Sequence, residues 1–512
     1  MKNVIAYDLG TGGIKASLYN QDGKSLASTF KAYDTSYPAE DFHEQRPDDW
    51  WEAVVATSRQ LIEETKVDPA TIEALAISGH SLGVVPIGKD GSLLLEKTPI
   101  WSDKRATKQA DRFFETVNYE EWYMETGNGF PQACYSIFKM MWYKDTMPEM
   151  YAQVDKFIGT KDYCNYKFTG RLCTDYSYAS GCGAYNLKKW EYNKNYIKAS
   201  GISEDMFPEI IESDAIVGNV SPEASKETGL PESVKVVCGG VDNALMSLGA
   251  RGIENGRVYT SLGTSAWIAI TSDEPVVDFQ YKPYVFAHAL KGYYVSATSI
   301  FSAGNSHKWV RDTLCGDFKE KENEGGIDAY VAMEELAMQS PIGSNKLLFN
   351  PSLAGGSMIE ASDDIVGAFA GLKVSTTRSD MVRATLEGIC LNLRMALDIL
   401  RTYGENELAE MLVVGGGAKS PLWRQIFADT YGLDIVKTGI DQDAASLGAA
   451  ALAFNGVGLW DGYKMIDELH VVEAKTEVNP ENKAKYDKIL PVFKQVAIFM
   501  AQTGDALKAL NI

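Results

Sequence analysis

The stretch Val4-Ile5-Ala6-Tyr7-Asp8-Leu9-Gly10-Thr11-Gly12-Gly13 decides the fold. Its apolar half predicts a strand, and its glycine-rich half predicts a tight turn. The alternating segment Ile14 to Tyr19 predicts a second strand, and Asn20-Gln21-Asp22-Gly23 predicts a hairpin turn into a third. The chain is therefore expected to open with three strands joined by a glycine loop and a hairpin.

A similar unit recurs at mid-chain. Val258 to Ser261 predicts a strand, Leu262-Gly263-Thr264-Ser265 a turn, and Ala266 to Ile270 a second strand. Gly263 follows Gly10 by 263 − 10 = 253 positions, about half of the 512 residues. The match predicts a duplicated domain whose halves each begin with a phosphate-sized loop. We place the halves at residues 1–250 and 251–512.

Helices alternate with short strands along the rest of the chain. Apolar residues spaced by three or four from Val382 to Leu400 predict a helix that Tyr403-Gly404 closes. Ser420-Pro421 predicts the start of another helix, with serine as its N-cap. A third helix is expected from Glu481 to Gln502, interrupted at Pro491. This alternation is typical of an α/β fold.

Composition excludes several classes of protein. Lys and Arg number 49 against 69 Asp and Glu, so the formal net charge is −20, which disfavours nucleic acid as a partner. No signal peptide or membrane span is recognisable, so no membrane association is expected. The 7 cysteines are scattered without a CxxC pair, which predicts reduced thiols and a cytoplasmic location.

The first glycine loop carries groups suited to a phosphate. Gly10 and Gly12 let backbone N–H groups approach an anion, Thr11 adds a hydroxyl, and Lys15 adds a positive charge. Asp8, at the end of the strand, is a candidate to hold Mg²⁺ through water. The loop does not have the spacing GxxxxGK[ST], so a P-loop nucleotide hydrolase is disfavoured. A plain hairpin turn remains an alternative for this loop taken alone.

Two later glycine loops are further nucleotide-binding candidates. Gly263, Thr264 and Ser265 repeat the first loop, and two such loops could clamp one nucleotide's phosphates. Gly415-Gly416-Gly417-Ala418 stands between a strand and a helix N-terminus, a geometry that suits a nucleotide. It is not GxGxxG and lacks the following acid, so a dinucleotide fold fits poorly. A tight strand-to-helix turn remains the alternative.

Asp242 is the candidate catalytic group. The apolar strand Val236 to Cys238 ends in Gly239-Gly240-Val241, which exposes this carboxylate and the adjacent Asn243. A carboxylate at a strand end suits a general base for a hydroxyl, as phosphoryl transfer requires. The alternative is an aspartate that caps the following helix.

A set of aromatic and polar residues suits a sugar. Trp101 could stack on the apolar face of a sugar, while Asp103 and Arg105 offer acceptors and donors to hydroxyls. His80 and Ser81 precede them in a glycine-flanked segment. A surface turn with a charge pair, and a core histidine, are the alternatives.

Together these motifs resemble the FGGY family of carbohydrate kinases over nearly the whole chain. Asp8-Leu-Gly-Thr and Ser261-Leu-Gly-Thr-Ser are similar to its two phosphate loops, and Gly239-Gly-Val-Asp-Asn to the segment of its catalytic base. Gly367-Ala-Phe-Ala-Gly-Leu with Asp380-Met-Val-Arg-Ala-Thr-Leu-Glu-Gly resembles its C-terminal signature. Further partial similarities are Ser136-Ile-Phe-Lys-Met-Met-Trp and the xylulokinase-like Gly415-Gly-Gly-Ala-Lys-Ser-Pro-Leu-Trp-Arg-Gln.

The resemblance implies two actin-like (ribonuclease H-like) ATPase domains around a central cleft, and transfer of the γ-phosphate of MgATP to a sugar hydroxyl. It assigns Asp242 as the base and Asp8 to the Mg²⁺ ion. It places Gly10, Thr11, Gly263 and Thr264 at the phosphates, and Gly416 and Gly417 at the nucleotide. ATP and a small sugar are the implied partners, and the resemblance leaves a homodimer open.

One departure bears on the sugar. Xylulokinases usually have a glutamine-methionine-histidine run where this chain has His80-Ser81-Leu82. Leu82 cannot hydrogen-bond a hydroxyl, and the loss of a polar partner changes specificity strongly. Xylulose or another ketopentose is the expected substrate, with ribulose, fuculose, gluconate and erythritol as alternatives.

Two other classes of function were weighed. An actin- or Hsp70-like ATPase with a protein partner needs neither the Asp242 segment nor the Trp101 to Arg105 motif. A catalytically inactive sugar sensor would not need to retain Asp8, Thr11, Asp242 and the triple glycine. The sequence therefore favours a sugar kinase.

Overall fold

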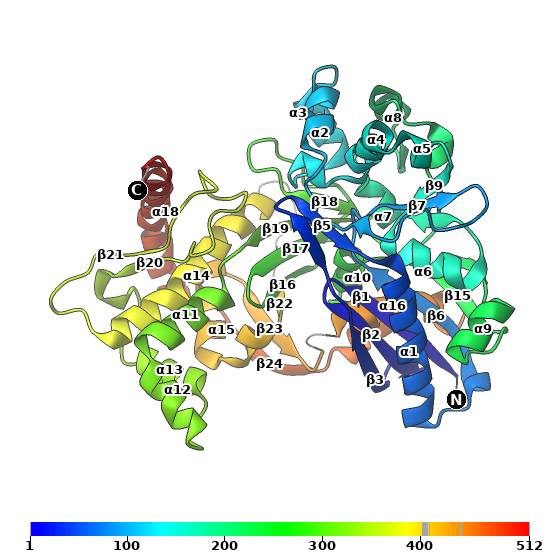
Figure 1. The fold of residues 1–512 in the computed structure, drawn as a ribbon. Coiled ribbons are helices and arrows are strands. Elements are labelled where there is room, and N and C mark those ends of the chain that lie inside the picture. The colour runs from blue at the N-terminus through cyan, green and yellow to red at the C-terminus, as the bar shows by residue number, and fades with distance from the viewer. Residues whose placement is uncertain (1, 402–407, 409, 441–442, 511–512) are drawn as a thin grey trace. The chain divides into compact units, whose positions relative to one another are not determined.

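The structure is a computed structural model that describes residues 2–401, 408, 410–440 and 443–510 (Figure 1). Two compact units interleave along the chain. The first comprises Met1–Asn255, Thr271–Ser296 and Asp443–His470, and the second comprises Gly256–Ile270, Ala297–Gln442 and Val471–Ile512. Each unit combines a mixed sheet with helices, so the predicted α/β class is confirmed.

The first unit is built on a six-stranded sheet. Its order is β14 (Ile216–Asn219), β15 (Lys235–Val241), β6 (Ile72–Gly79), β1 (Asn3–Gly10), β2 (Gly13–Asn20) and β3 (Ser25–Ala32). β1, β2 and β3 run antiparallel to one another, whereas β6 runs parallel to both β1 and β15. The three opening strands are therefore confirmed, and β1 lies inside the sheet.

Helices cover both faces of this sheet. α1 (Pro47–Thr65) contacts β2 and β3 and packs beside α6 (Thr160–Thr169), while α10 (Asp242–Gly249) and α16 (Ala444–Gly456) contact one another and β1, β6 and β15. β1 is apolar on both faces because it lies between these two helical layers.

α10 and α16 approach closely at glycine. A Cβ atom on Gly448 would lie 2.2 Å from the carbonyl oxygen of Leu245, and one on Gly249 would lie 1.8 Å from that of Ala444. Only glycine allows the two backbones this distance, so small residues set the packing of these helices.

The second unit repeats the pattern. Its sheet has the order β19 (Tyr294–Ile300), β17 (Ala266–Ser272), β16 (Val258–Leu262), β22 (Glu410–Val414), β23 (Asp434–Thr438) and β24 (Val472–Thr476). β16 pairs antiparallel with β17 and parallel with β22, as β1 does with β2 and β6. The duplication predicted from the two glycine loops is thus present in the strand pairing.

The second unit's helices include α11 (Gly304–Leu314), α13 (Ala329–Ala337), α14 (Arg378–Arg401), α15 (Pro421–Tyr431) and α18 (Pro480–Lys508). Ser420 caps α15 as predicted, because its hydroxyl accepts from the backbone N–H of Trp423 at 3.0 Å. The predicted end of α14 at Tyr403-Gly404 lies outside the described residues. The predicted interruption at Pro491 is wrong, since α18 continues through it.

None of the helices in the described part of the chain has the length and apolar character needed to cross a membrane. All seven cysteines are buried free thiols.

Candidate functional site

The first glycine loop is a two-residue turn between β1 and β2. The carbonyl oxygen of Gly10 accepts from the Tyr33 hydroxyl, and that of Thr11 accepts from Gln45 Nε2 at 2.7 Å. The Thr11 hydroxyl accepts from the indole Nε1 of Trp101 at 3.0 Å. The loop's carbonyl oxygens are therefore already bonded inside the protein, which leaves an anion-binding role to its N–H groups.

Two carboxylates lie near this loop in the first unit. Asp8 ends β1 and Asp242 begins α10. Burial raises the pKa of Asp8, which the nearby Ser78 and Lys15 lower in part. Burial, with a smaller contribution from the charge of Asp8, raises the pKa of Asp242 to about 7. Each carboxylate thus disfavours ionisation of the other.

The backbone before Asp242 is specialised. Gly239 has a φ of +73°, and a Cβ atom there would lie 2.1 Å from the carbonyl oxygen of Ile77. Asp242 does not cap α10, because Val241 is the N-cap residue. The Asp242 carboxylate accepts from the backbone N–H of Asn243 at 2.8 Å, and both side chains are partly exposed. The glycine strand end therefore presents a carboxylate, as the sequence predicts.

Lys15 pairs with Asp443 at the start of α16. Its positive charge is thus shared between that ion pair and Asp8. Among the described residues, no group of three or more His, Cys, Asp or Glu side chains could hold a metal ion alone. Magnesium commonly binds one or two carboxylates together with substrate phosphates, and Asp8 fits that requirement.

His80 and Ser81 follow the end of β6 and are both buried. Neither ring nitrogen of His80 has a hydrogen-bond partner, and its ring contacts Trp50 edge-on at 5.7 Å between centroids. Burial lowers the pKa of His80 to about 3, so the ring is neutral. A neutral imidazole offers one donor and one acceptor.

Lys139 was noted in the sequence only as part of a partial motif. Its buried ammonium donates to the carbonyl oxygen of Leu82 at 3.0 Å and to that of Ile100 at 2.7 Å. It therefore ties the His80 segment to the Trp101 segment. Burial lowers the pKa of Lys139 to about 8.

Trp101 is 38% exposed, but Asp103 and Arg105 are used inside the protein. The Arg105 guanidinium bonds Asp103 and Glu44 and lies 4.1 Å from the ring centroid of Phe42. Asp103 also accepts from the backbone N–H of His43 at 2.8 Å. These two side chains brace the loop that carries Trp101 and have no polar atom to spare for a hydroxyl.

The second unit holds a pocket of about 610 Å³. Gly263, Thr264, Gly416 and Gly417 line it, so the structure brings two of the predicted glycine loops together. Ser265 is exposed outside the lining, and Ala418 is buried behind it.

The N-terminus of α11 supports the second glycine loop. Gly304 N–H donates to the carbonyl oxygen of Gly263 at 2.9 Å, and Asn305 N–H donates to that of Thr264 at 2.9 Å. As in the first loop, the carbonyl oxygens are occupied. The N–H groups again remain for an anion.

Other pocket residues were missed by sequence reasoning. His307, Tyr330 and Trp423 form an aromatic group, with the His307 ring 4.9 Å from Tyr330 and 5.1 Å from Trp423 between centroids. They come from α11, α13 and α15. Of the three, only Trp423 stands in a recognisable motif. The other two belong to helices whose sequences carry no local signal of a site.

Comparisons with known proteins agree with this arrangement. Residues 3–249 match the N-terminal domain, and residues 258–456 the C-terminal domain, of the FGGY family of carbohydrate kinases. The xylulose kinase of Bacillus subtilis is 30% identical over all of both chains. The gluconokinase of Bacillus licheniformis is 27% identical over 96% of this chain and 94% of its own.

Solved structures show the same fold. A gluconate kinase from Lactobacillus acidophilus superposes with a TM-score of 0.88 at 26% identity, covering 99% of each chain. A ligand-bound xylulose kinase from the same organism also gives 0.88 at 26% identity, covering 99% of this chain and 100% of its own. The chain therefore belongs to the FGGY family of carbohydrate kinases, phosphotransferases that act on sugar hydroxyls, and has their actin-like ATPase fold.

Proposed function

We propose that this protein transfers the γ-phosphate of MgATP to a hydroxyl of a ketopentose such as xylulose, with Asp242 as the general base. The observation that carries the proposal is the carboxylate of Asp242 at the end of β15, with its pKa raised to about 7. A base whose pKa lies near the working pH is both deprotonated and basic enough to accept a hydroxyl proton.

The phosphates would bind at the two glycine loops. Gly10, Thr11 and Gly12 would offer N–H and hydroxyl donors from the first unit, with Lys15 adding charge, and Gly263, Thr264 and Ser265 would do so from the second. Asp8 would hold Mg²⁺, which supplies charge neutralisation at the phosphate oxygens when bound. Occupied carbonyl oxygens in both loops support this role, because free carbonyl oxygens would repel an anion.

The adenosine would occupy the 610 Å³ pocket of the second unit. Gly416, Gly417 and Ala418 would form the backbone beneath it, and the aromatic group of His307, Tyr330 and Trp423 would supply apolar contact. A pocket of this size and partly apolar lining suits a nucleoside.

The sugar would bind near His80, Ser81, Trp101, Asp242 and Asn243. His80 is the polar contact in this set that replaces the one lost at Leu82, because both its ring nitrogens are buried without a partner. Asp103 and Arg105 would act by holding the Trp101 loop in place.

Charge favours a neutral sugar over gluconate. His80 is neutral, and the positive charge of Arg105 is balanced by Asp103 and Glu44. Neither side chain offers a free positive charge to a sugar carboxylate. Gluconate remains the second candidate because gluconokinases are among the relatives.

A substrate panel tests the proposal. ADP release is measured with MgATP and each of D-xylulose, L-xylulose, D- and L-ribulose, L-fuculose, D-gluconate, glycerol and erythritol. We expect one ketopentose to raise turnover far above the rate without sugar. Highest kcat/KM with gluconate would overturn the charge argument, and no stimulation by any compound while ATP still binds would overturn the ketopentose proposal.

A further inference from the structure

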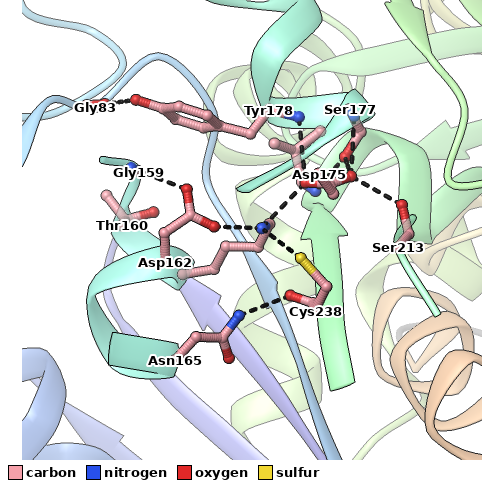
Figure 2. Close-up of polar contacts among 12 residues, drawn as sticks. Gly83, Gly159, Thr160, Asp162, Asn165, Asp175, Ser177, Tyr178, Ser213 and Cys238 are labelled. Atoms are coloured by element: carbon pink, nitrogen blue, oxygen red, sulfur yellow. Dashed lines mark hydrogen bonds and ion pairs between the residues drawn. The ribbon is translucent and has the colours of Figure 1, made fainter. Parts of the chain in front are cut away.

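A buried charged network lies behind the strand that carries Asp242 (Figure 2). Lys161 of α6 pairs with Asp162 and, at 3.0 Å, with Asp175. Asp175 in turn accepts from the hydroxyl of Ser213 at 2.9 Å and from both the backbone N–H and the hydroxyl of Ser177. All of these side chains are at most 1% exposed, so the network is sealed from water.

The charges of the network are compensated within the protein. Burial opposes the charge of Lys161, but Asp162 and Asp175 outweigh it, and the pKa of Lys161 lies well above its usual value. One positive and two negative groups leave a net charge of −1. Asp162 lies in the first turn of α6, and Asp175 is the N-cap of α7 (Tyr176–Ser180), where backbone N–H groups favour negative charge.

The network ends on the backbone of β15. The hydroxyl of Ser177 accepts from the N–H of Val241 at 2.9 Å, one residue before Asp242. The same segment is held at Cys238, whose carbonyl oxygen accepts from Asn165 at 2.8 Å, and at Gly239, whose N–H donates to the carbonyl oxygen of Ser213 at 2.9 Å.

These bonds replace part of the sheet. The pairing of β15 with β6 shifts register between Val237 and Gly240, so the ladder is irregular just before the catalytic segment. An irregular strand end needs other partners for its N–H and C=O groups. The direction of the Asp242 side chain is then set by Ser177 and its neighbours as well as by the sheet.

We propose that Ser177, oriented by Asp175 and the Lys161 ion pair, is a positioning residue that holds the end of β15 and thereby aims the Asp242 carboxylate at the sugar hydroxyl. The proposal rests on the proposed function, because it takes Asp242 as the base. A buried ion pair gives little net stability, so a role in geometry accounts for it better than a role in stability.

Ser177→Ala tests this role, with Ser180→Ala as the matched control. Ser180 lies on the same helix, is equally buried and makes two hydrogen bonds, to the carbonyl oxygen of Ser177 and from the N–H of Ala287, but none to β15. With the best sugar and MgATP, we expect Ser177→Ala to lower kcat about 10-fold with both KM values within about 2-fold. Ser180→Ala should leave kcat within about 2-fold, and Ser177→Thr, which keeps the hydroxyl, should recover most of the loss.

A double variant separates positioning from a general structural effect. In an Asp242→Asn background, Ser177→Ala should lower the residual kcat by less than about 2-fold, because no base remains to be aimed. A full 10-fold loss in that background, or an unchanged kcat in Ser177→Ala alone, would overturn the proposal. A normal kcat in Asp242→Asn itself would instead overturn the proposed function.

If Ser177→Ala does not fold, Ser213→Ala replaces it. That variant removes one donor to Asp175 but leaves the backbone bond from Ser213 to Gly239 in place. We expect a loss in kcat of about 3-fold, again absent in the Asp242→Asn background. An unchanged kcat in Ser213→Ala would then overturn the proposal.

Discussion

Asp242 is a carboxylate that its surroundings keep partly protonated at neutral pH. Its position after two glycines was evident from the sequence, but its raised pKa was not, because that depends on burial and on Asp8, which is 234 positions away (242 − 8). Sequence reasoning also placed Asp103 and Arg105 at the sugar. It could not show that Glu44 and His43 occupy their polar atoms, since those contacts span about 60 residues.

The raised pKa of Asp242 has a cost in stability that depends on pH. Between its ordinary value of 3.8 and about 7, the folded protein holds a proton that the unfolded chain has lost. The free energy of unfolding from this group therefore falls as pH rises through that window. Three units correspond to at most about 4 kcal/mol. We expect Asp242→Asn to melt at a higher temperature than the parent at pH 8 without Mg²⁺ or ATP, and the difference to shrink towards pH 4. Equal melting temperatures at pH 8 would contradict the buried charge.

His80 carries the prediction about sugar binding. Removing a buried polar group that bonds the sugar should weaken sugar binding selectively, so His80→Ala is expected to raise the KM for sugar at least about 10-fold more than the KM for ATP. His288→Ala is the control, because burial also lowers the pKa of His288 to about 3 but its Nδ1 already accepts from the N–H of Leu290. Steady-state kinetics check both variants, and equal effects on the two KM values in His80→Ala would place His80 outside the sugar site.

At the scale of elements, periodicity and capping signals were good guides and proline was not. The apolar spacing from Val382 to Leu400 and the Ser420 cap both correspond to observed helices. α18 continues through Pro491 because its flanks are anchored, with Phe493 fully buried and the Tyr486 hydroxyl bonded to Glu387 at 2.9 Å. Tertiary contacts thus outweigh the local cost of proline, which a sequence pattern does not reveal.

Pro491→Ala should therefore stabilise the protein. The substitution restores a backbone N–H donor towards residue 487 and removes the ring's clash with the preceding turn, and Pro491 is exposed, so no packing is lost. We expect a gain of about 1–3 kcal/mol in the free energy of unfolding, measured by denaturant titration. Val492→Ala, at the exposed neighbouring position, is the control and should change stability by less than about 0.5 kcal/mol. A loss of stability in Pro491→Ala would show that the proline is needed where it stands.

At the scale of the whole molecule, the duplication was readable because each half begins with the same short motif. The division at residue 250 stays a prediction, while the compact units of the structure interleave along the chain. α16 shows why: it comes from Ala444–Gly456, yet it packs on β1 and α10 of the first unit. Its buried alanines predict a packed helix but not its partner, since all its faces are apolar.

The account as a whole depends on Asp242 being the base of a sugar kinase. The most direct test is kcat of Asp242→Asn at saturating MgATP and the best sugar of the panel, with ATP affinity measured by calorimetry on the same protein. We predict that kcat falls by on the order of 10²–10⁴ while ATP affinity changes by less than about 2-fold. A kcat close to that of the parent would contradict the central claim and require another group to take the hydroxyl proton.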